Sequence, residues 1–304
     1  MTPAGRRTLC FANPDWPTQA RRAGYSDAAI ASAQLLETQG YAVVKSGISQ
    51  DHCSRAIAAF RVWVEQNKEY AESRRLPDGH FPRFVNFHSI SDPVLDLFAE
   101  NRAALELQDL VFGARAALYT SLFYERGSAQ DIHRDVPYFC TYPRDLYLGV
   151  WVALEAATLT NGPLMMIPGG HAVANVDPVE VATKHFGGKL PVSVPPIDDG
   201  LWVAYQSRVT EECFARGLNR VVAPLEAGDT LIWHPLLPHG GSPIVDARLT
   251  RFSVVFHTTP ENVPVYQGDV FFSGRYPDRP DRPRWAYRRY KGRPVADLPG
   301  GQFQ

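Results

Sequence analysis

A series of short apolar segments separated by turn residues constrains the fold of this chain most. Between residues 116 and 257, stretches rich in β-branched and aromatic residues alternate with Gly, Pro, Asn and Asp. This pattern is typical of antiparallel strands joined by tight turns. The predicted strands are 117–124, 133–139, 145–154, 163–168, 220–224, 229–233 and 250–257, with an earlier one at 41–45. About eight short strands favour a double-stranded β-helix, the jelly-roll or cupin-like barrel.

Helical patterns precede most of these strands. Ser26-Asp27 offers an N-cap to a helix that ends near Gly40, and Ser49 offers one to a second helix. Asp92-Pro93 begins a third helix, because proline is favoured in the first helical turn. We therefore expect a chain that is mainly β with flanking helices, its jelly-roll core packed against the N-terminal helices.

The 304 residues are predicted to form a single domain, since jelly rolls with added helices often reach this length. Its expected parts are an N-terminal arm at 1–24, a helical layer at 25–115, a jelly-roll core at 116–258 with an insertion at 172–218, and an irregular C-terminal tail at 259–304. Within the insertion, a short helix is expected around 210–216.

Composition and charge narrow the choice of partners and compartment. A net charge of −1 argues against nucleic acid or an anionic membrane as the main partner. No apolar run approaches the length of about 18 residues that suggests a membrane-spanning helix, and the N-terminus lacks the apolar region of a signal peptide. The four cysteines form no C-x-x-C pair. We expect a cytoplasmic protein that acts on a small molecule, with its oligomeric state left open.

The segment Gln130–Phe139 carries His133 and Asp135 two residues apart. Side chains two apart on a strand point to the same face, so this imidazole and carboxylate would supply two thirds of a metal site. Taken alone, such a pair is more often a hydrogen bond or a surface ion pair. The best third ligand is His239, at a turn after an apolar strand, whereas the nearby His234 suits a packed position better.

An arginine follows His239 at the start of the last predicted strand. Arg251 and Ser253 are two residues apart on that strand and should share a face. A guanidinium matches a carboxylate in shape and charge, and a hydroxyl can support the pair. Arg248 is the alternative, but it lies in a loop. Together with the three metal-type residues, this pattern predicts a site for a metal and a small dicarboxylate.

Four blocks carry a wider resemblance. They are H-R-D-V-P-Y-F beginning at residue 133, the strand at 151–154, N-G-P-L-M-M-I-P-G-G-H at 161–171, and A-G-D-T-L-I-W-H-P-L-L-P-H-G-G at 227–241. In this order and spacing the chain, from about residue 40 to 257, resembles the phytanoyl-CoA dioxygenase family of Fe(II)- and 2-oxoglutarate-dependent oxygenases. The resemblance implies that His133, Asp135 and His239 bind iron and that Arg251 holds the distal carboxylate of 2-oxoglutarate.

The chain departs from the family pattern close to the predicted cosubstrate site. Family members often have Ser directly after H-G, where this chain has Gly241, and Ser242 or Ser253 is expected to substitute. Tyr119 and Trp151 are predicted to form walls of the cosubstrate site.

The resemblance implies a non-haem dioxygenase that uses Fe(II), 2-oxoglutarate and O2 and releases succinate and CO2. Because Asp135 is present, the site resembles the hydroxylating members and not the halogenases, which have a small residue there. We expect hydroxylation of an unactivated C–H bond of a small organic molecule, in natural-product biosynthesis, with desaturation and ring chemistry left open. The segment 172–218 and the loop 76–92 are candidate lid and substrate walls, although a solvated loop is an equal interpretation of 76–92.

Two other functions are compatible with a jelly roll. One is a cupin-type metal enzyme without a keto-acid cosubstrate, which leaves Arg251 and Ser253 unexplained. The other is a non-catalytic binding protein, which would not need His133, Asp135 and His239 together.

Overall fold

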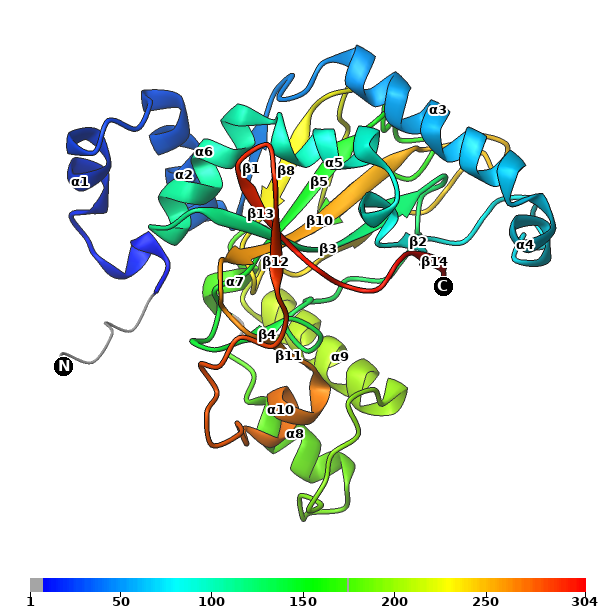
Figure 1. Cartoon of the computed structure of the whole chain (residues 1–304). Coiled ribbons are helices and arrows are strands. Elements are labelled where there is room, and N and C mark those ends of the chain that lie inside the picture. Colours follow the sequence, from blue (N-terminus) through cyan, green and yellow to red (C-terminus); the bar gives the residue numbers. More distant parts are fainter. Residues whose placement is uncertain (1–7, 174) are drawn as a thin grey trace.

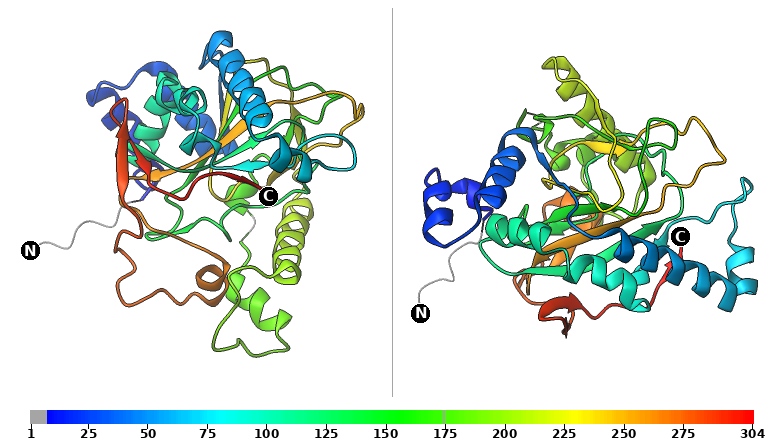
Figure 2. Two further views of the ribbon diagram at one scale, coloured as in Figure 1. Left: turned by 45° about the vertical axis from the view of Figure 1, so that its right-hand side comes forward. Right: turned by 90° about the horizontal axis from the view of Figure 1, so that it is seen from above.

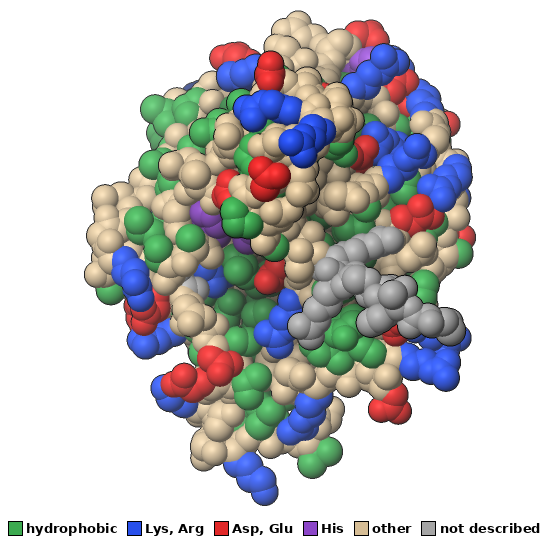
Figure 3. Space-filling view, turned by 90° about the vertical axis from the view of Figure 1, so that its left-hand side faces the viewer, with side chains coloured by type: hydrophobic (Ala, Val, Ile, Leu, Met, Phe, Trp, Pro, Cys, Tyr) green, Lys and Arg blue, Asp and Glu red, His purple; other side chains and the backbone are tan. Residues whose placement is uncertain are grey.

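A computed structural model describes residues 8–173 and 175–304 of the chain (Figure 1). Residues 1–7, part of the predicted arm, and residue 174 lie outside the described residues. None of the helices in the described residues is long and apolar enough to cross a membrane. On the face shown in Figure 3, acidic and basic side chains are interspersed.

The N-terminal helices cover one face of a large sheet, as the views in Figures 1 and 2 show. They are α1 (Trp16–Arg22), α2 (Asp27–Gln39), α3 (Gln50–Gln66), α4 (Lys68–Ser73), α5 (Asp92–Ala99) and α6 (Arg102–Phe112), with the 3-10 turns η1 (Cys10–Ala12) and η2 (Phe87–Ser89). The predicted caps are present, because the Ser26 and Ser49 hydroxyls accept the N–H groups of Ala29 and His52. Gly40 ends α2 in the left-handed conformation, at φ 85°.

The large sheet has nine strands and runs in the order β1-β8-β5-β10-β3-β13-β12, with β2 on β3 and β14 on β2. Their bounds are β1 (Tyr41–Val44), β2 (Phe84–Val85), β3 (Ala116–Tyr124), β5 (Leu148–Ala153), β8 (Thr230–Trp233), β10 (Ser253–Pro260), β12 (Tyr287–Tyr290), β13 (Arg293–Ala296) and β14 (Gln302–Phe303). The neighbours β3, β10, β5 and β8 pair antiparallel. Both faces of β5 are buried, which explains its uninterrupted apolar sequence.

Alternate residues of β5 face two different layers. Val150 and Val152 join the core between the sheet and the N-terminal helices, whereas Trp151 and Ala153 join a core on the opposite face. The second core is completed by a three-stranded sheet, in the order β7-β6-β9. Its strands are β7 (Val221–Ala223), β6 (Leu164–Met166) and β9 (His239–Gly241), and a separate pair is formed by β4 (Cys140–Thr141) and β11 (Val265–Tyr266).

The predicted insertion at 172–218 is more helical than the sequence suggested. It holds the end of α7 (Gly170–Val173) and all of α8 (Pro178–His185) and α9 (Asp199–Ala215), which pack with α10 (Gly268–Ser273) beyond one end of the sheets (Figure 1). The side chain of Asp198 caps α9 by accepting the N–H of Leu201, so the helix begins well before residue 210. In the described residues the helices contain more residues than the strands. A sheet core packed against N-terminal helices is present, as predicted. The description "mainly β" underestimates how much of the chain is helical.

Two predictions about the chain ends are wrong. Residues 9–22 are no loose arm, because Trp16 is only 3% exposed and its Nε1 donates to Glu37 of α2 at 3.1 Å. The tail is not irregular either, since β12 and β13 form a hairpin at the edge of the main sheet. Tyr290 and Lys291 of this hairpin both donate to Asp96 of α5, at 2.7 and 2.6 Å.

Candidate active site and metal centre

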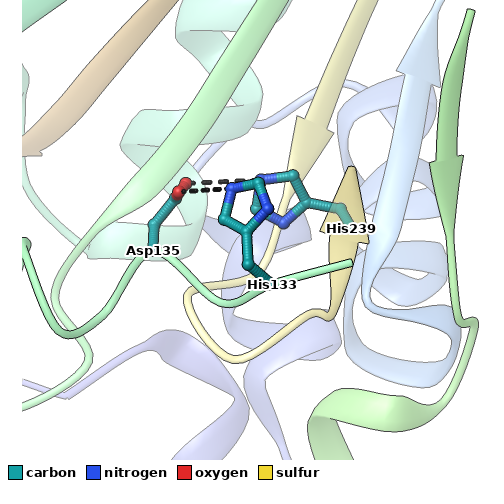
Figure 4. A group of neighbouring side chains, drawn as sticks. All are labelled: His133, Asp135 and His239. Carbon is teal, nitrogen blue, oxygen red and sulfur yellow. Dashed lines mark ion pairs between the residues drawn. The ribbon is translucent and has the colours of Figure 1, made fainter. Parts of the chain in front are cut away.

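Three buried side chains meet at one place beside the two sheets (Figure 4). His133 Nε2 lies 3.4 Å from Asp135 Oδ1, and His239 Nε2 lies 3.5 Å from Asp135 Oδ2. One ligand-type atom from each residue lies within 4.8 Å of the others. Two imidazole nitrogens and one carboxylate on a common side are the donor set of a facial iron triad. The structure therefore brings together the three residues that the sequence singled out.

The backbone that carries His133 and Asp135 is not a strand, contrary to the prediction for 133–139. Only His133 pairs, in a bridge with His239, through N···O distances of 2.8 and 2.9 Å. The Asp135 carbonyl then accepts the N–H groups of Tyr138 and Phe139, which closes a turn. Pro137 lies inside this turn and lacks the N–H that a ladder would need. The bridge and the turn, instead of strand alternation, bring the two side chains together.

Each imidazole is oriented by a backbone carbonyl. His133 Nδ1 lies 2.7 Å from the Asp131 carbonyl, and His239 Nδ1 lies 2.9 Å from the Leu237 carbonyl. An N–H at each Nδ1 leaves the lone pair on Nε2, the atom that faces Asp135. Both rings are thus held in the tautomer that binds a metal.

Asp135 is held by two aromatic donors. Tyr147 donates its hydroxyl to Asp135 Oδ2 at 2.7 Å, and Trp233 Nε1 donates to the same oxygen at 3.2 Å. Neither donor was predicted from the sequence. One signal was present for Tyr147, because it lies an even number of residues before Trp151 and so belongs to the same face of that segment.

Electrostatics keep Asp135, His239 and Tyr147 in the states that a cation site requires. Burial opposes ionisation of Asp135, but His239 and His133 beside it hold its pKa well below the usual range. Burial lowers the pKa of His239 to about 4, so its imidazole is neutral near pH 7. Burial and the nearby Asp135 raise the pKa of Tyr147 well above its ordinary value, so Tyr147 stays a donor. A carboxylate and neutral imidazoles are the forms that bind metal.

Arg251 lies just before β10, and its guanidinium is almost fully buried, at 1% exposure. Nη1 donates to the Gly162 carbonyl at 2.5 Å, and the guanidinium carbon lies 5.3 Å from the centre of the Trp151 ring. Among the described residues, Nε has no hydrogen-bond partner and no carboxylate lies within ion-pair distance. Burial lowers the pKa of Arg251 to about 10. Glu155 acts on Arg251 only from beyond ion-pair distance. A buried cation without a directly paired carboxylate is costly, so this position suits an anionic ligand.

A cavity of about 590 Å³ joins the triad to Arg251. Of the other predicted site residues, Tyr119 and Trp151 line it and Ser253 does not. Tyr119 packs against Trp285, with ring centres 4.6 Å apart. The alternative Arg248 is exposed and paired with Asp246, away from the cavity.

The proposed walls contribute to the same cavity. The loop 76–92 supplies Arg83 and Asn86, and the segment 172–218 supplies Asp199 and Trp202. Trp202 stacks on Tyr138 with ring centres 4.7 Å apart. The loop 76–92 is therefore a wall of the cavity and more than a solvated connection.

Several known proteins resemble this chain in sequence. Residues 36–253 match the family model described as "Phytanoyl-CoA dioxygenase (PhyH)". The chain is 30% identical, over 230 residues and 68% of each chain, to a probable phytanoyl-CoA dioxygenase of Caenorhabditis elegans. It is 28% identical over 116 residues to the human peroxisomal phytanoyl-CoA dioxygenase, a match that spans 38% of this chain and only 29% of the human protein.

Solved structures with a similar fold hold iron or the keto acid. The epimerase SnoN, in complex with Fe3+, alpha ketoglutarate and a nogalamycin, is 19% identical, with a TM-score of 0.58 over 83% of this chain and 91% of that one. EctD from S. alaskensis with bound Fe is 18% identical, with a TM-score of 0.55 over 86% of both chains. At these identities the likeness shows the fold.

Proposed function

The chain belongs to the phytanoyl-CoA dioxygenase family of non-haem Fe(II)- and 2-oxoglutarate-dependent oxygenases. From this premise we propose that it hydroxylates an unactivated C–H bond of a small organic molecule, with release of succinate and CO2. One observation carries the proposal. A single cavity contains the buried His133, Asp135 and His239 group and the buried guanidinium of Arg251, which has no carboxylate partner among the described residues.

The donor set fits Fe(II). We propose that Nε2 of His133, Nε2 of His239 and a carboxylate oxygen of Asp135 hold the metal on one side, which leaves the other side for cosubstrate and O2. Bound Fe(II) and 2-oxoglutarate together supply the activation of O2, which the side chains alone cannot provide. The chain's own task is to fix the ligands, and the carbonyl and aromatic partners described above do this.

The other end of the cavity fits 2-oxoglutarate. We propose that Arg251 binds its distal carboxylate, because Gly162 occupies only Nη1 of the guanidinium. Trp151, beside the guanidinium, and Tyr119 are the proposed walls. A carboxylate here would pair directly with a buried charge whose acidic neighbour, Glu155, lies beyond ion-pair distance.

The remaining walls face the substrate. Tyr138 and Trp202 form an aromatic surface, and Arg83 and Asp199 add charge of both signs. Closing such walls around the substrate would keep water from the reacting carbon. We propose a modest organic molecule, of the kind made in natural-product biosynthesis, as the substrate.

The two facing sheets also support a finer description of the fold. Alternate side chains of β5 point to the helices and to the small sheet, as in a double-stranded β-helix. We propose that residues 1–304 form one catalytic domain around this jelly roll. The rival functions explain less, since a cupin without a keto acid leaves the Arg251 charge unpaired and a binding protein has no use for the triad.

Titration of the anaerobic Fe(II)-loaded protein with 2-oxoglutarate tests the proposal. The wild type should develop the weak visible charge-transfer band of the bound keto acid. Arg251→Ala should raise the Kd for 2-oxoglutarate by roughly 100-fold, because a charge-assisted bidentate pair is lost. The matched control is Arg248→Ala, which removes an exposed arginine.

Two results would contradict the proposal in different ways. Absence of the charge-transfer band in the wild type would contradict the proposed oxygenase function. A normal Kd in Arg251→Ala with a weakened one in Arg248→Ala would transfer the carboxylate site to Arg248.

A further inference from the structure

The main cavity follows the strand β10 far beyond Arg251. Arg251, Val255 and His257 all line it. Arg251 and His257 are six residues apart, which corresponds to roughly 20 Å of extended chain. A molecule of 2-oxoglutarate that is held by Arg251 and bound to the metal leaves the end of the cavity at His257 for the substrate.

His257 is a buried histidine whose Nδ1 has no hydrogen-bond partner among the described residues. The residue is 2% exposed, and its ring stacks on that of Phe139 with centres 4.1 Å apart. The ring centre of Tyr147, which donates to Asp135, lies 5.8 Å away. Burial lowers the pKa of His257 to about 4, so its imidazole is neutral near pH 7. An unpartnered imidazole is thus buried close to the metal ligands, and a ligand that binds it would remove a cost in free energy.

Asn86 presents a second polar group to the cavity. Its Oδ1 accepts the Thr120 hydroxyl and, at 3.2 Å, the backbone N–H of Ser121. Because a backbone N–H can only donate, the amide oxygen must lie on this side and the NH2 group on the other. That NH2 group makes no hydrogen bond within the described residues, and Asn86 lines the cavity. Asn86 also has φ 57°, a left-handed conformation that is uncommon outside glycine and is frequent at ligand sites.

Thr120 lies between these two groups. It is paired with His257 across β3 and β10, so their Cβ atoms are about 5 Å apart. On the other side of β3, Asn86 directly follows β2 and binds the Thr120 hydroxyl. All three residues line the cavity. The sheet therefore places an amide and an imidazole, each with an N–H to donate, on either side of one threonine.

We propose that Asn86 and His257 form a substrate subsite that binds an uncharged oxygen, a carbonyl or a hydroxyl, beside the metal. Both groups are neutral donors, so they offer no counter-charge to a carboxylate. This inference rests on the proposed function and goes beyond it, because it names a chemical group of the substrate and the residues that select it. Asn86 and His257 bind and orient the substrate and take no part in a bond-breaking step.

The test uses three aromatic probes of similar size. Acetophenone carries a carbonyl, ethylbenzene carries no oxygen, and benzoate carries a charge. Each is titrated calorimetrically into the anaerobic protein loaded with Fe(II) and 2-oxoglutarate. The wild type should bind acetophenone more tightly than it binds ethylbenzene or benzoate.

Two conservative variants remove the donors. His257→Phe keeps a ring that stacks on Phe139, and Asn86→Asp keeps the acceptor for Thr120. Each should raise the Kd for acetophenone roughly fivefold, the effect of losing one neutral hydrogen bond. The Kd for ethylbenzene should stay within about twofold of the wild-type value.

Two controls accompany these variants. The Kd for 2-oxoglutarate should stay within about twofold in both, because Arg251 and the metal ligands are untouched. His52→Phe is the matched control, since it removes a histidine of α3 that does not line the cavity. It should leave the Kd for acetophenone unchanged.

The outcomes separate the inference from the function. The inference is overturned, and the function stands, if the wild type binds 2-oxoglutarate but binds acetophenone no better than ethylbenzene. It is equally overturned if neither substitution weakens acetophenone, or if benzoate binds more tightly than acetophenone and is weakened by the same substitutions. A loss of 2-oxoglutarate affinity in His257→Phe would assign His257 to the cosubstrate instead. A wild type that binds Fe(II) but no 2-oxoglutarate contradicts the proposed function itself.

Discussion

At the residue level, the arrangement around Asp135 shows how a protein prepares a carboxylate for a cation. Tyr147 and Trp233 both donate to Oδ2, while Oδ1 faces His133. Such hydrogen bonds behind a ligand fix its direction, and their loss commonly reduces metal affinity by about 10- to 100-fold. Neither aromatic residue needs to touch the metal to matter for its binding.

Tyr147→Phe tests this role with a minimal change. It removes one hydroxyl, and we expect Fe(II) affinity to fall roughly tenfold or more while the fold is retained. Metal titration measures the affinity, and circular dichroism checks the fold.

Tyr290→Phe is the matched control, because Tyr290 also donates to a carboxylate at 2.7 Å, that of Asp96 in α5. It should leave Fe(II) affinity unchanged. Equal metal affinity in Tyr147→Phe and the wild type would show that Trp233 alone suffices.

At the element level, helix α9 is attached to the metal-ligand turn by one side chain. Gln206 Oε1 accepts the Arg134 N–H at 2.8 Å, and Gln206 Nε2 donates to the Arg134 carbonyl at 2.9 Å. Arg134 lies between the ligands His133 and Asp135 and is itself buried. The helix that supplies Trp202 to the cavity therefore also supports the backbone of the ligands.

Gln206→Leu should remove the hydrogen bonds that join α9 to the turn carrying His133 and Asp135. It leaves a buried N–H and a buried carbonyl without partners, so the free energy of unfolding should fall by about 2–4 kcal/mol. We also expect weaker Fe(II) binding, because the turn that carries His133 and Asp135 loses its support. Urea denaturation and metal titration measure the two effects.

Ser207→Leu provides the comparison for Gln206→Leu, since residue 207 is the exposed neighbour on the same helix. It should change stability by no more than about 0.5 kcal/mol. If Gln206→Leu is destabilised but binds Fe(II) normally, α9 is a wall of the cavity and no support for the ligands.

At the level of the whole molecule, the packing of helices on the sheet buries a titratable group that does not line the cavity. His88 in η2 is 2% exposed, and its Nδ1 lies 2.7 Å from the Ser121 hydroxyl of β3. Burial, with a smaller contribution from Arg288, lowers the pKa of His88 to about 3. In the unfolded chain a histidine has a pKa of about 6.5.

This difference predicts a pH-dependent stability. Between about pH 6.5 and pH 3 the unfolded state binds a proton at His88 that the folded state does not, so stability falls as the pH falls. One histidine contributes a slope of up to about 1.4 kcal/mol per pH unit. His88→Gln should remove this slope, and urea denaturation from pH 7.5 to 4.5 measures it.

Above pH 7 the difference in stability between His88→Gln and the wild type should be constant, because histidine is neutral in both states. If the free energy of unfolding changes with pH equally in the two proteins below pH 6.5, the predicted burial of a neutral imidazole is contradicted.

Local sequence signals determined much of this protein. The caps at Ser26 and Ser49 and the apolar run of β5 depend on neighbouring residues, so periodicity and capping patterns predict them. The blocks around His133 and His239 likewise identify the family from the order and spacing of their residues alone. Short-range predictions failed where a turn resembles a strand, as at 133–139.

Tertiary structure decided which distant segments approach each other. Gly127, Gly240 and Gly241 allow a loop and β9 to pack at distances that any Cβ would prevent. That approach brings Ser128 into the wall of the cavity that Arg251 also lines. Periodicity reports which face of an element is buried, but it does not report what lies against that face. The metal ligands were therefore readable from the sequence, and the surroundings that orient them emerged only from the packing of remote segments.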